Sequence, residues 1–485
     1  MDIKREAVRG VAWSTIQRGG TQVISFIVFA ILSRLLDPDA FGLVALATVF
    51  IALIQIFLDQ GFVSAIIQQE VIEEIHLDTA FWSSVGMGGM MTILAVVVSK
   101  FVAAIYHEPQ LTRILQFLSI SMLLLALGST QRAVLTRELS FNKLAIWTLA
   151  SEIAGGVVGI IFAFRGFGVW SLVGRNLVRD FIGLLVLWTV SGWRPRFSFS
   201  NSHFKELFRF GINVIGERLL YFVNRNLDRL LLGYFLGATV LGYYSVGIRL
   251  VELMIKLFFE TVSFVAFPVF SRIQNDIVKM RNAFFRVIKL SGMLTFPAFA
   301  GISILSSDII QALFGSKWEA SIPILRIVSM SGIIYGITYL IPHILLAVGK
   351  PDWRFRIAFI NTIIYIIAIF IGVHWGVIGV AFGIVVSYLS ISPVLFWSIN
   401  QIMKVQLVDY VQQFYPAIIG SAVMTVSILV MQSFISSFVS VEISLFIQII
   451  LGLTLYSLSI YIVDRHTLQE MVAIAGNLLP AKEKK

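Results

Sequence analysis

Residues 207–267 read LFRFGINVIGERLLYFVNRNLDRLLLGYFLGATVLGYYSVGIRLVELMIKLFFETVSFVAF, a stretch that is apolar enough to cross a membrane twice. It nevertheless carries Glu217, Arg218, Arg225, Asp228, Arg229, Arg249, Glu252, Lys256 and Glu260. A charge at the centre of a membrane helix costs roughly 2.5–3.5 kcal/mol on insertion scales, so these side chains must face protein or water. At about 100° per residue, those of 249–260 fall within an arc of about 80° and those of 217–229 fall on one side of the preceding helix. The stretch therefore predicts two adjacent helices that turn charged faces inward.

The composition indicates a polytopic membrane protein, because the 485 residues are 58% hydrophobic and only 13% charged. The chain has no cysteine, which excludes disulfides and thiolate chemistry. It has no Walker A, HExxH or GxSxG motif and no metal-binding pattern among its six histidines, so we expect no enzyme, no cofactor and no metal. The net charge of +10 comes from basic residues between apolar spans, which is a topology signal and does not indicate nucleic acid binding.

The hydropathy pattern predicts about 14 transmembrane helices. Their approximate limits are 11–35, 41–67, 80–105, 114–135, 144–164, 168–190, 207–236, 241–267, 286–306, 321–348, 355–373, 376–400, 413–434 and 443–463, and the seventh is a candidate for a break near Arg225. Lysine and arginine concentrate at the two ends and in the even-numbered loops, which predicts that both termini are cytoplasmic. In the eighth loop, apolar residues at helical spacing between Ile273 and Ile288 predict an amphipathic helix on the cytoplasmic leaflet.

The two halves of the chain resemble each other at an offset of 200 residues. The matched pairs are Arg18 and Arg218, Val23 and Val223, Leu32 and Leu232, Leu36 and Leu236, and Gly42 and Gly242. We therefore expect an N-terminal lobe at 1–200, a C-terminal lobe at 201–405, and two extra helices with a tail at 406–485. In parallel repeats of this kind the binding site lies between the lobes.

Polar stripes within the spans give the candidate site residues. Arginine and lysine suit anionic groups of a substrate, and the candidates are Arg18, Arg175, Arg179, Arg218, Arg249 and Lys256. Carboxylates beside them are candidates for coupling to H⁺ or Na⁺, namely Asp59, Glu152, Glu217 and Glu252.

Simpler interpretations stay open for several of these residues. Arg179 with Asp180, and Asp228 with Arg229, lie near predicted span limits, which favours side chains that extend to the membrane interface. Glu252 and Lys256 are spaced to neutralise each other on one helix face. The glycine pairs Gly155/Gly159 and Gly379/Gly383 favour close helix contacts over hinges.

Several motifs together resemble the Wzx-type polysaccharide flippases, of the colanic-acid-exporter-like branch. They are LSRLLDPDAFG at 32–42, DQGF at 59–62, QRAVLTRELSF at 131–141, GFGVWSLV at 166–173 and LGYY at 241–244. The resemblance implies the multidrug/oligosaccharidyl-lipid/polysaccharide (MOP) superfamily. Its fold is an all-α integral membrane protein, with two parallel-repeat six-helix lobes in a V (MATE/MOP-like) and here two further C-terminal helices.

The same resemblance implies a function. A flippase of this type moves undecaprenyl-diphosphate-linked oligosaccharide from the cytoplasmic to the periplasmic leaflet of the bacterial inner membrane by alternating access, for O-antigen, capsule or exopolysaccharide synthesis. Its expected partners are this lipid-linked oligosaccharide, membrane lipids, H⁺ or Na⁺, and a polysaccharide polymerase with a chain-length regulator.

Two alternatives remain open at this stage. A cation-coupled multidrug exporter of the same superfamily would need a predominantly acidic and aromatic cavity, whereas basic residues outnumber acidic ones within the spans of this chain. A membrane scaffold or polymerase of polysaccharide assembly is the other, although the outer loops are short for a polymerase.

Overall fold

The structure is a computed structural model, which describes residues 3–58, 66, 72–435 and 439–469. Throughout these ranges the regular elements are helices, with no strand. The chain divides into two compact units, Met1–Ser245 and Val246–Lys485. The all-α class is confirmed, whereas the lobe limits at 200 and 405 stay predictions.

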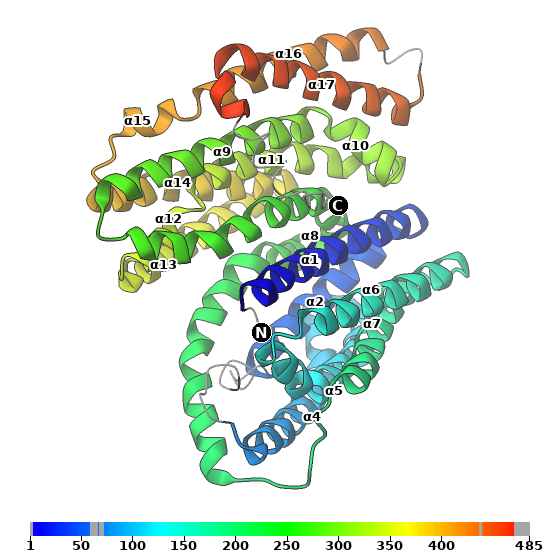
Figure 1. The fold of residues 1–485 in the computed structure, drawn as a ribbon. Coiled ribbons are helices and arrows are strands. Elements are labelled where there is room, and N and C mark those ends of the chain that lie inside the picture. The colour runs from blue at the N-terminus through cyan, green and yellow to red at the C-terminus, as the bar shows by residue number, and fades with distance from the viewer. Residues whose placement is uncertain (1–2, 59–65, 67–71, 436–438, 470–485) are drawn as a thin grey trace, which may run out of the picture. The chain divides into compact units, whose positions relative to one another are not determined.

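The first unit is a bundle of antiparallel helices and the first part of a very long one. The helices are α1 (Ile3–Leu35), α2 (Pro38–Leu58), α4 (Glu74–Ile105), α5 (Pro109–Arg137), α6 (Phe141–Phe164), α7 (Val169–Val190) and α8 (Asn201–Ile273). Helix α6 packs against α7 and α1, while α5 packs against α4, α7 and α2 (Figure 1). Proline stands at the start of α2 and α5, where its missing N–H leaves no hydrogen bond unmade.

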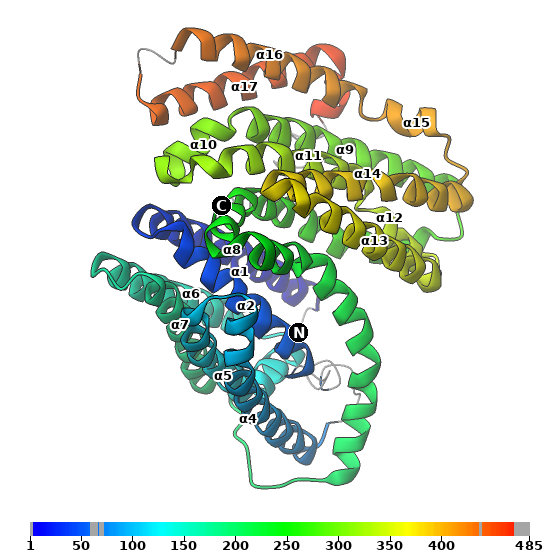
Figure 2. The same cartoon turned by 180° about the vertical axis from the view of Figure 1, so that it is seen from behind.

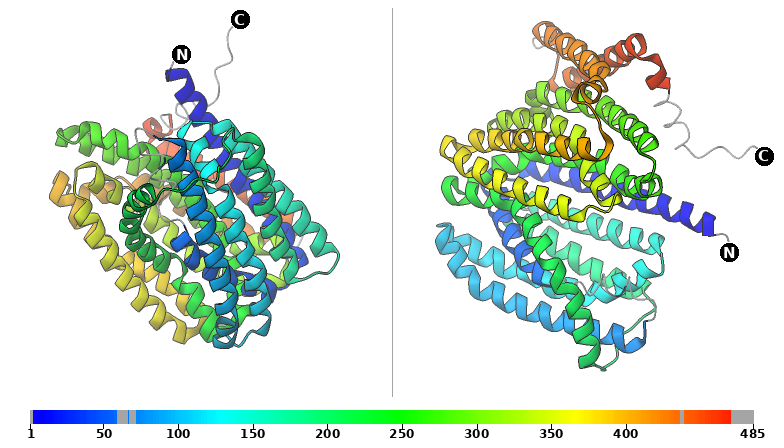
Figure 3. Two further views of the ribbon diagram at one scale, coloured as in Figure 1. Left: turned by 90° about the horizontal axis from the view of Figure 1, so that it is seen from below. Right: turned by 90° about the vertical axis from the view of Figure 1, so that its left-hand side faces the viewer.

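The second unit holds the remaining helices, which follow the end of α8. They are α9 (Ile277–Ile304), α10 (Ser306–Leu313), the 3₁₀ turn η1 (Ser316–Ser321), α11 (Ile322–Thr338), α12 (Ile341–Ala347), α13 (Pro351–Gly372), the 3₁₀ turn η2 (Val373–Trp375), α14 (Gly376–Met403), α15 (Leu407–Gln412), α16 (Tyr415–Ile435) and α17 (Val441–Val463). Helix α11 packs against α9 and α14, and α13 lies along α14 (Figure 2). The last pair, α16 and α17, lie side by side, with α16 against α9 (Figure 3).

In the part of the chain that the structure describes, the predicted spans fall on helices, the tenth being divided between α11 and α12. Residues 59–65 and 67 of the second span lie outside the described residues. Ten described segments are long and apolar enough to cross a membrane. Helix α7 is not among them, because Arg175, Arg179 and Asp180 interrupt its apolar sequence. Its 22 residues are nevertheless about 33 Å long, enough for the hydrocarbon core.

Helix α8 contains two predicted spans and changes direction at a single residue. Gly237 has φ 83° and ψ 174°, a conformation that glycine adopts readily and that other residues avoid. The helix continues without a break through Arg225, so the break expected there is wrong, and the kink at Gly237 lies between the seventh and eighth predicted spans. A single glycine therefore takes the place of the loop between the seventh and eighth spans.

The bend in α8 meets the turn between α1 and α2 through two reciprocal contacts. A Cβ atom on Gly42 would lie 1.7 Å from the carbonyl oxygen of Ala238, and one on Gly242 would lie 1.9 Å from that of Pro38. Both pairs are related by the 200-residue offset found in the sequence. Asp39 accepts a hydrogen bond of 3.4 Å from Thr239, its own counterpart at that offset. Equivalent parts of the two repeats thus contact each other symmetrically, and only glycine fits at the two closest points.

Glycines also set the spacing of two helix pairs, as predicted. A Cβ on Gly155 would lie 2.6 Å from the Arg175 carbonyl oxygen, which lets α6 approach α7 closely. On α14, a Cβ on Gly379 would lie 2.1 Å from the carbonyl oxygen of Gly372, and Gly383 faces Ala368 of α13 at similar range. The prediction of close helix contacts at both glycine pairs is therefore confirmed.

The expected amphipathic helix on the cytoplasmic leaflet is wrong. Ile273 is the last residue of α8, and the residues from Ile277 onward form the first turns of α9, which continues without interruption into the ninth span. Met280, Phe284 and Ile288 are fully buried within the second unit, and the Phe284 ring stacks on Tyr410 of α15 with centroids 5.9 Å apart. The apolar stripe was read correctly, but it packs against protein, because α15 supplies a partner that the local sequence does not reveal.

Candidate functional site

The first unit contains a cavity of about 690 Å³. Its wall comprises residues from α1, α2, α4, α5, α6, α7 and the first part of α8. The polar side chains in the wall come mostly from consecutive turns of α5, α6 and α7, where Gly128 and Gly183 let side chains of the neighbouring helices approach the backbone closely. This volume is in the range that binds a drug-sized ligand or the head of a larger one.

The charge of the wall is predominantly positive. Among the described residues that line the cavity are four arginines, Arg132, Arg179, Arg218 and Arg225, and two carboxylates, Glu152 and Asp180. Both carboxylates are engaged by arginine side chains. The wall of this unit therefore favours an anionic ligand.

A buried ion pair joins α6 and α7 beside the cavity. Arg175 donates to Glu152 at 2.6 Å and to the Ser25 hydroxyl of α1 at 3.2 Å. Only 11% of the Arg175 side chain and 7% of the Glu152 side chain are exposed. Three helices are tied together at this point, and the cavity wall includes Glu152 but not Arg175. Arg175 is thus placed to hold Glu152 in position and is not itself exposed to the cavity.

The next arginine along α7 has a different setting. Arg179 contacts the neighbouring carboxylate of Asp180 at 3.0 Å, and 39% of its side chain is exposed. The Asp180 side chain is only 7% exposed. Arg179 therefore combines a fixed anchor with a guanidinium that is accessible from the cavity.

In both helix-end pairs the carboxylate is buried in protein, so neither carboxylate extends outward as the simpler interpretation expected. Asp180 is buried in the cavity wall beside Arg179. Asp228 is 5% exposed and accepts a hydrogen bond from the hydroxyl of Tyr244, which is itself fully buried. Asp228 and Tyr244 lie on opposite sides of the Gly237 bend, so this buried bond helps to hold the bend.

The rest of the wall mixes hydroxyl and amide groups with aromatic rings. Gln55, Ser129 and Thr148 supply hydrogen-bonding groups, and Trp147 and Tyr221 supply ring surfaces. Such a wall can accommodate a hydrated polar ligand as well as an anionic group.

Three candidates from the sequence meet at the cavity, namely Arg179, Arg218 and Glu152, and Arg175 lies directly behind Glu152. Arg249, Glu252 and Lys256 belong to the second unit, where all three are half-buried and have interaction partners. Arg18, Asp59 and Glu217 are outside the residues whose side chains the structure describes. The role of the whole candidate set in binding and coupling stays a prediction.

Two lining arginines were not among the candidates. Arg225 lies on the charged stripe of its span, so its position on the helix face was a usable signal. Arg132 gives no such signal, because it lies close to the end of its span, where a basic residue normally marks the membrane boundary.

Comparison with known proteins gives the family. Residues 31–323 match the family described as polysaccharide biosynthesis protein. The chain belongs to this family. This match confirms the predicted resemblance to polysaccharide flippases. The relatives of this polysaccharide biosynthesis protein confirm it as well. One is the lipopolysaccharide biosynthesis protein WzxC of Escherichia coli, 27% identical over 83% of this chain and 84% of its own length.

Further relatives have related names. The succinoglycan biosynthesis transport protein ExoT of Rhizobium meliloti is 28% identical over 74% of this chain and 73% of its own length. The teichuronic acid biosynthesis protein TuaB of Bacillus subtilis is 27% identical over 87% of this chain and 88% of its own.

Solved structures share the fold. The lipid II flippase MurJ, in an inward closed conformation, superposes with a TM-score of 0.77 at 17% identity, over 94% of this chain and 99% of MurJ. An inward-facing MATE multidrug transporter of the MOP superfamily superposes with a TM-score of 0.64 at 14% identity, over 80% and 98% of the two chains. The predicted MOP fold is therefore confirmed, and the polysaccharide biosynthesis protein is a multi-pass membrane protein.

Proposed function

We propose that this protein is a flippase that carries undecaprenyl-diphosphate-linked oligosaccharide from the cytoplasmic to the periplasmic leaflet of the bacterial inner membrane by alternating access. The observation that carries the proposal is the arginine-rich cavity, found in a chain whose relatives are named for the synthesis and transport of surface polysaccharides.

The cavity has the chemistry that such a substrate needs. A diphosphate that leaves water requires fixed cations, and guanidinium groups can bind phosphate oxygens in pairs. Arg132, Arg179 and Arg218 provide three such groups from three different helices. The hydroxyl, amide and aromatic groups of the wall suit the first sugars, and the isoprenoid chain can remain in the bilayer.

A multidrug exporter fits the site less well. The likeness to MATE transporters concerns the fold, which both classes share. A lipophilic cation would meet four arginines in the described wall and two carboxylates that already have arginine partners. Selectivity arises from repelling the wrong ligand as well as from binding the right one, so this wall supports an anionic substrate.

Coupling and orientation are part of the same proposal. Both termini face the cytoplasm, and H⁺ or Na⁺ is exchanged at one or more of the acidic candidates. Glu152, the one described in the cavity wall, is held by Arg175, so an ion that binds there has to compete with this guanidinium. A polymerase and a chain-length regulator are the proposed partners that use the flipped product.

The proposal predicts that loss of cavity arginines stops export. Arg218→Ala and Arg132→Ala should each weaken binding of the lipid-linked oligosaccharide about 10- to 100-fold, because a charge-assisted hydrogen bond contributes about 1.5–3 kcal/mol. Lysine should restore it only in part, since it lacks the paired donors. The measurements are surface polysaccharide in cells and thermal stabilisation of purified protein by the lipid-linked oligosaccharide.

The matched control is Arg165→Ala, which removes an exposed arginine in the turn after α6, away from the cavity. Normal export by the triple variant Arg132→Ala, Arg179→Ala, Arg218→Ala at unchanged expression would disprove the role of the cavity. Stabilisation of the wild type by ethidium-like cations, and not by the lipid-linked oligosaccharide, would favour the multidrug exporter.

A further inference from the structure

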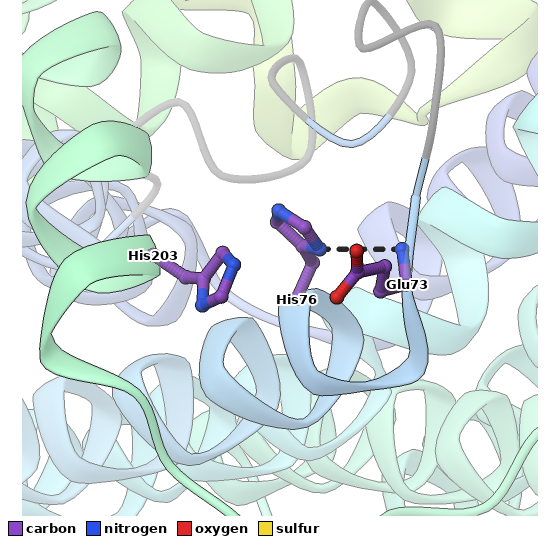
Figure 4. Close-up of side chains that lie close together, drawn as sticks. All are labelled: Glu73, His76 and His203. Carbon is purple, nitrogen blue, oxygen red and sulfur yellow. Dashed lines mark hydrogen bonds between the residues drawn. The ribbon is translucent and has the colours of Figure 1, made fainter.

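Two histidines and a glutamate from distant parts of the sequence meet outside the cavity. Glu73 and His76 stand at the start of α4, and His203 lies in the first turn of α8 (Figure 4). Their ligand atoms all lie within 4.8 Å of one another. The imidazole of His76 is buried, that of His203 is half-buried, and their ring centroids are 4.0 Å apart.

The segment before α8 is fixed to α4, which determines where His203 lies. Asp78 accepts a hydrogen bond of 2.9 Å from the backbone N–H of Arg196 and a second one from the hydroxyl of Ser198. Thr79 accepts from the backbone N–H of Ser200 at 3.1 Å. These bonds hold the segment along the first turns of α4, so the approach of His203 to His76 does not depend on a free loop.

The two imidazole rings differ in their hydrogen bonds. Nδ1 of His203 lies 2.7 Å from the Ser200 hydroxyl, which orients the ring and leaves Nε2 for another partner. Nδ1 of His76 accepts the backbone N–H of Glu73 at 3.2 Å, as a helix-capping side chain does. A capping box formed by the two side chains accounts for the placement of Glu73 and His76, but it does not account for the position of His203 beside them.

We propose that Glu73, His76 and His203 bind a divalent first-row transition metal ion, of which Zn²⁺ suits the donors best. Two imidazole nitrogens and one carboxylate oxygen are a common zinc ligand set, and water can complete a tetrahedral site. His203 binds through Nε2, with Ser200 as the outer partner that such ligands usually have. His76 binds through Nδ1 and exchanges the Glu73 N–H for the ion.

The consequence of binding is local and mechanical. The ion links the start of α8 to the start of α4. It therefore restrains the first turn of α8, which follows the α7–α8 connection. In the proposed orientation this point faces the cytoplasm. The site goes beyond the proposed function and departs from the sequence-based expectation of no metal, because no local motif joins residues so far apart in the chain.

The test measures Zn²⁺ binding to full-length purified protein without a polyhistidine tag, by competition with a chromogenic chelator, and Co²⁺ binding by visible absorption. We expect one site, and at least 10-fold weaker binding in His203→Ala and in His76→Gln. Glutamine retains an acceptor for the capping hydrogen bond, so His76→Gln keeps the helix start and removes the imidazole. His374→Ala, which removes an exposed histidine of the second unit, is the control and should bind normally.

A second measurement reports on the link itself. Zn²⁺ should slow hydrogen exchange at the backbone of residues 200–205 in the wild type and in His374→Ala, and should leave it unchanged in His203→Ala. Absence of a micromolar site in the wild type, or equal binding by the wild type and both site variants, would overturn the proposal. Neither result depends on export, so failure here would leave the flippase proposal standing.

Discussion

At the scale of single residues, the same type of side chain has two roles in α7. Arg175 and Arg179 are one turn apart, yet the first is buried against Glu152 and the second is accessible from the cavity. The sequence predicts that both face inward, because charges within a span avoid lipid. It does not predict which one is paired across helices, since that depends on how α6 and α7 are aligned through Gly155.

The buried ion pair between Arg175 and Glu152 should contribute to the free energy of unfolding. Arg175→Ala should destabilise the protein by about 3–5 kcal/mol, because it leaves the Glu152 carboxylate uncompensated in the protein interior. Adding Glu152→Gln should restore much of this loss, since the neutral amide no longer needs a counterion. Thermal unfolding of the wild type, both single variants and the double variant measures the coupling. If the double variant loses the sum of the two single losses, the residues are not energetically coupled.

At the scale of helices, the sequence predicts where the elements lie much better than how they meet. Within the described residues, the spans predicted from hydropathy fall on helices. The limits of the seventh and eighth spans place a change of direction at 237–240, but they do not reveal that α8 continues as one helix with Gly237 as its only non-helical residue. The sequence also does not predict the burial of the α9 stripe, because a lipid surface and the α15 surface require the same apolar pattern.

The contact at the α8 bend gives a prediction at this scale. Gly42→Ala should lower the stability of the purified protein by about 1–3 kcal/mol, because the new methyl group would overlap the Ala238 carbonyl and force the backbone apart. Gly242→Ala should have a similar effect through Pro38. Gly86→Ala is the control, since a Cβ at Gly86 of α4 meets nothing within 4 Å. If Gly42→Ala melts as Gly86→Ala does, the close contact does not exist in solution.

At the scale of the whole molecule, composition and motifs together predicted the class, the fold and the family. Of the candidate residues, Arg179, Arg218 and Glu152 line the cavity, whereas Arg132 was not a candidate because it lies close to the end of its span and on no polar stripe. The lobe limits at 200 and 405 stay predictions. The compact units are defined by packing, whereas a repeat is defined by equivalent positions in the two halves of the sequence.

The orientation in the membrane can be tested directly, because the chain has no cysteine. Single cysteines at Pro38 and Lys317 should react with an impermeant thiol reagent in intact cells, and those at Arg137 and Arg281 should react only after permeabilisation. This result follows from the excess of lysine and arginine in the even-numbered loops. Labelling at position 281 in intact cells would reverse the proposed orientation.

The reciprocal glycine contacts have a consequence for the history of the chain. Position 42 touches position 238 as position 242 touches position 38, which is the isologous pattern of a two-fold symmetric homodimer. A half-length ancestor could make this contact with a second copy of itself, and each substitution there would then alter both sides at once. After fusion into one chain, each side can change alone. Differences between the two halves can therefore accumulate at this contact by single steps, as an asymmetric substrate pathway requires.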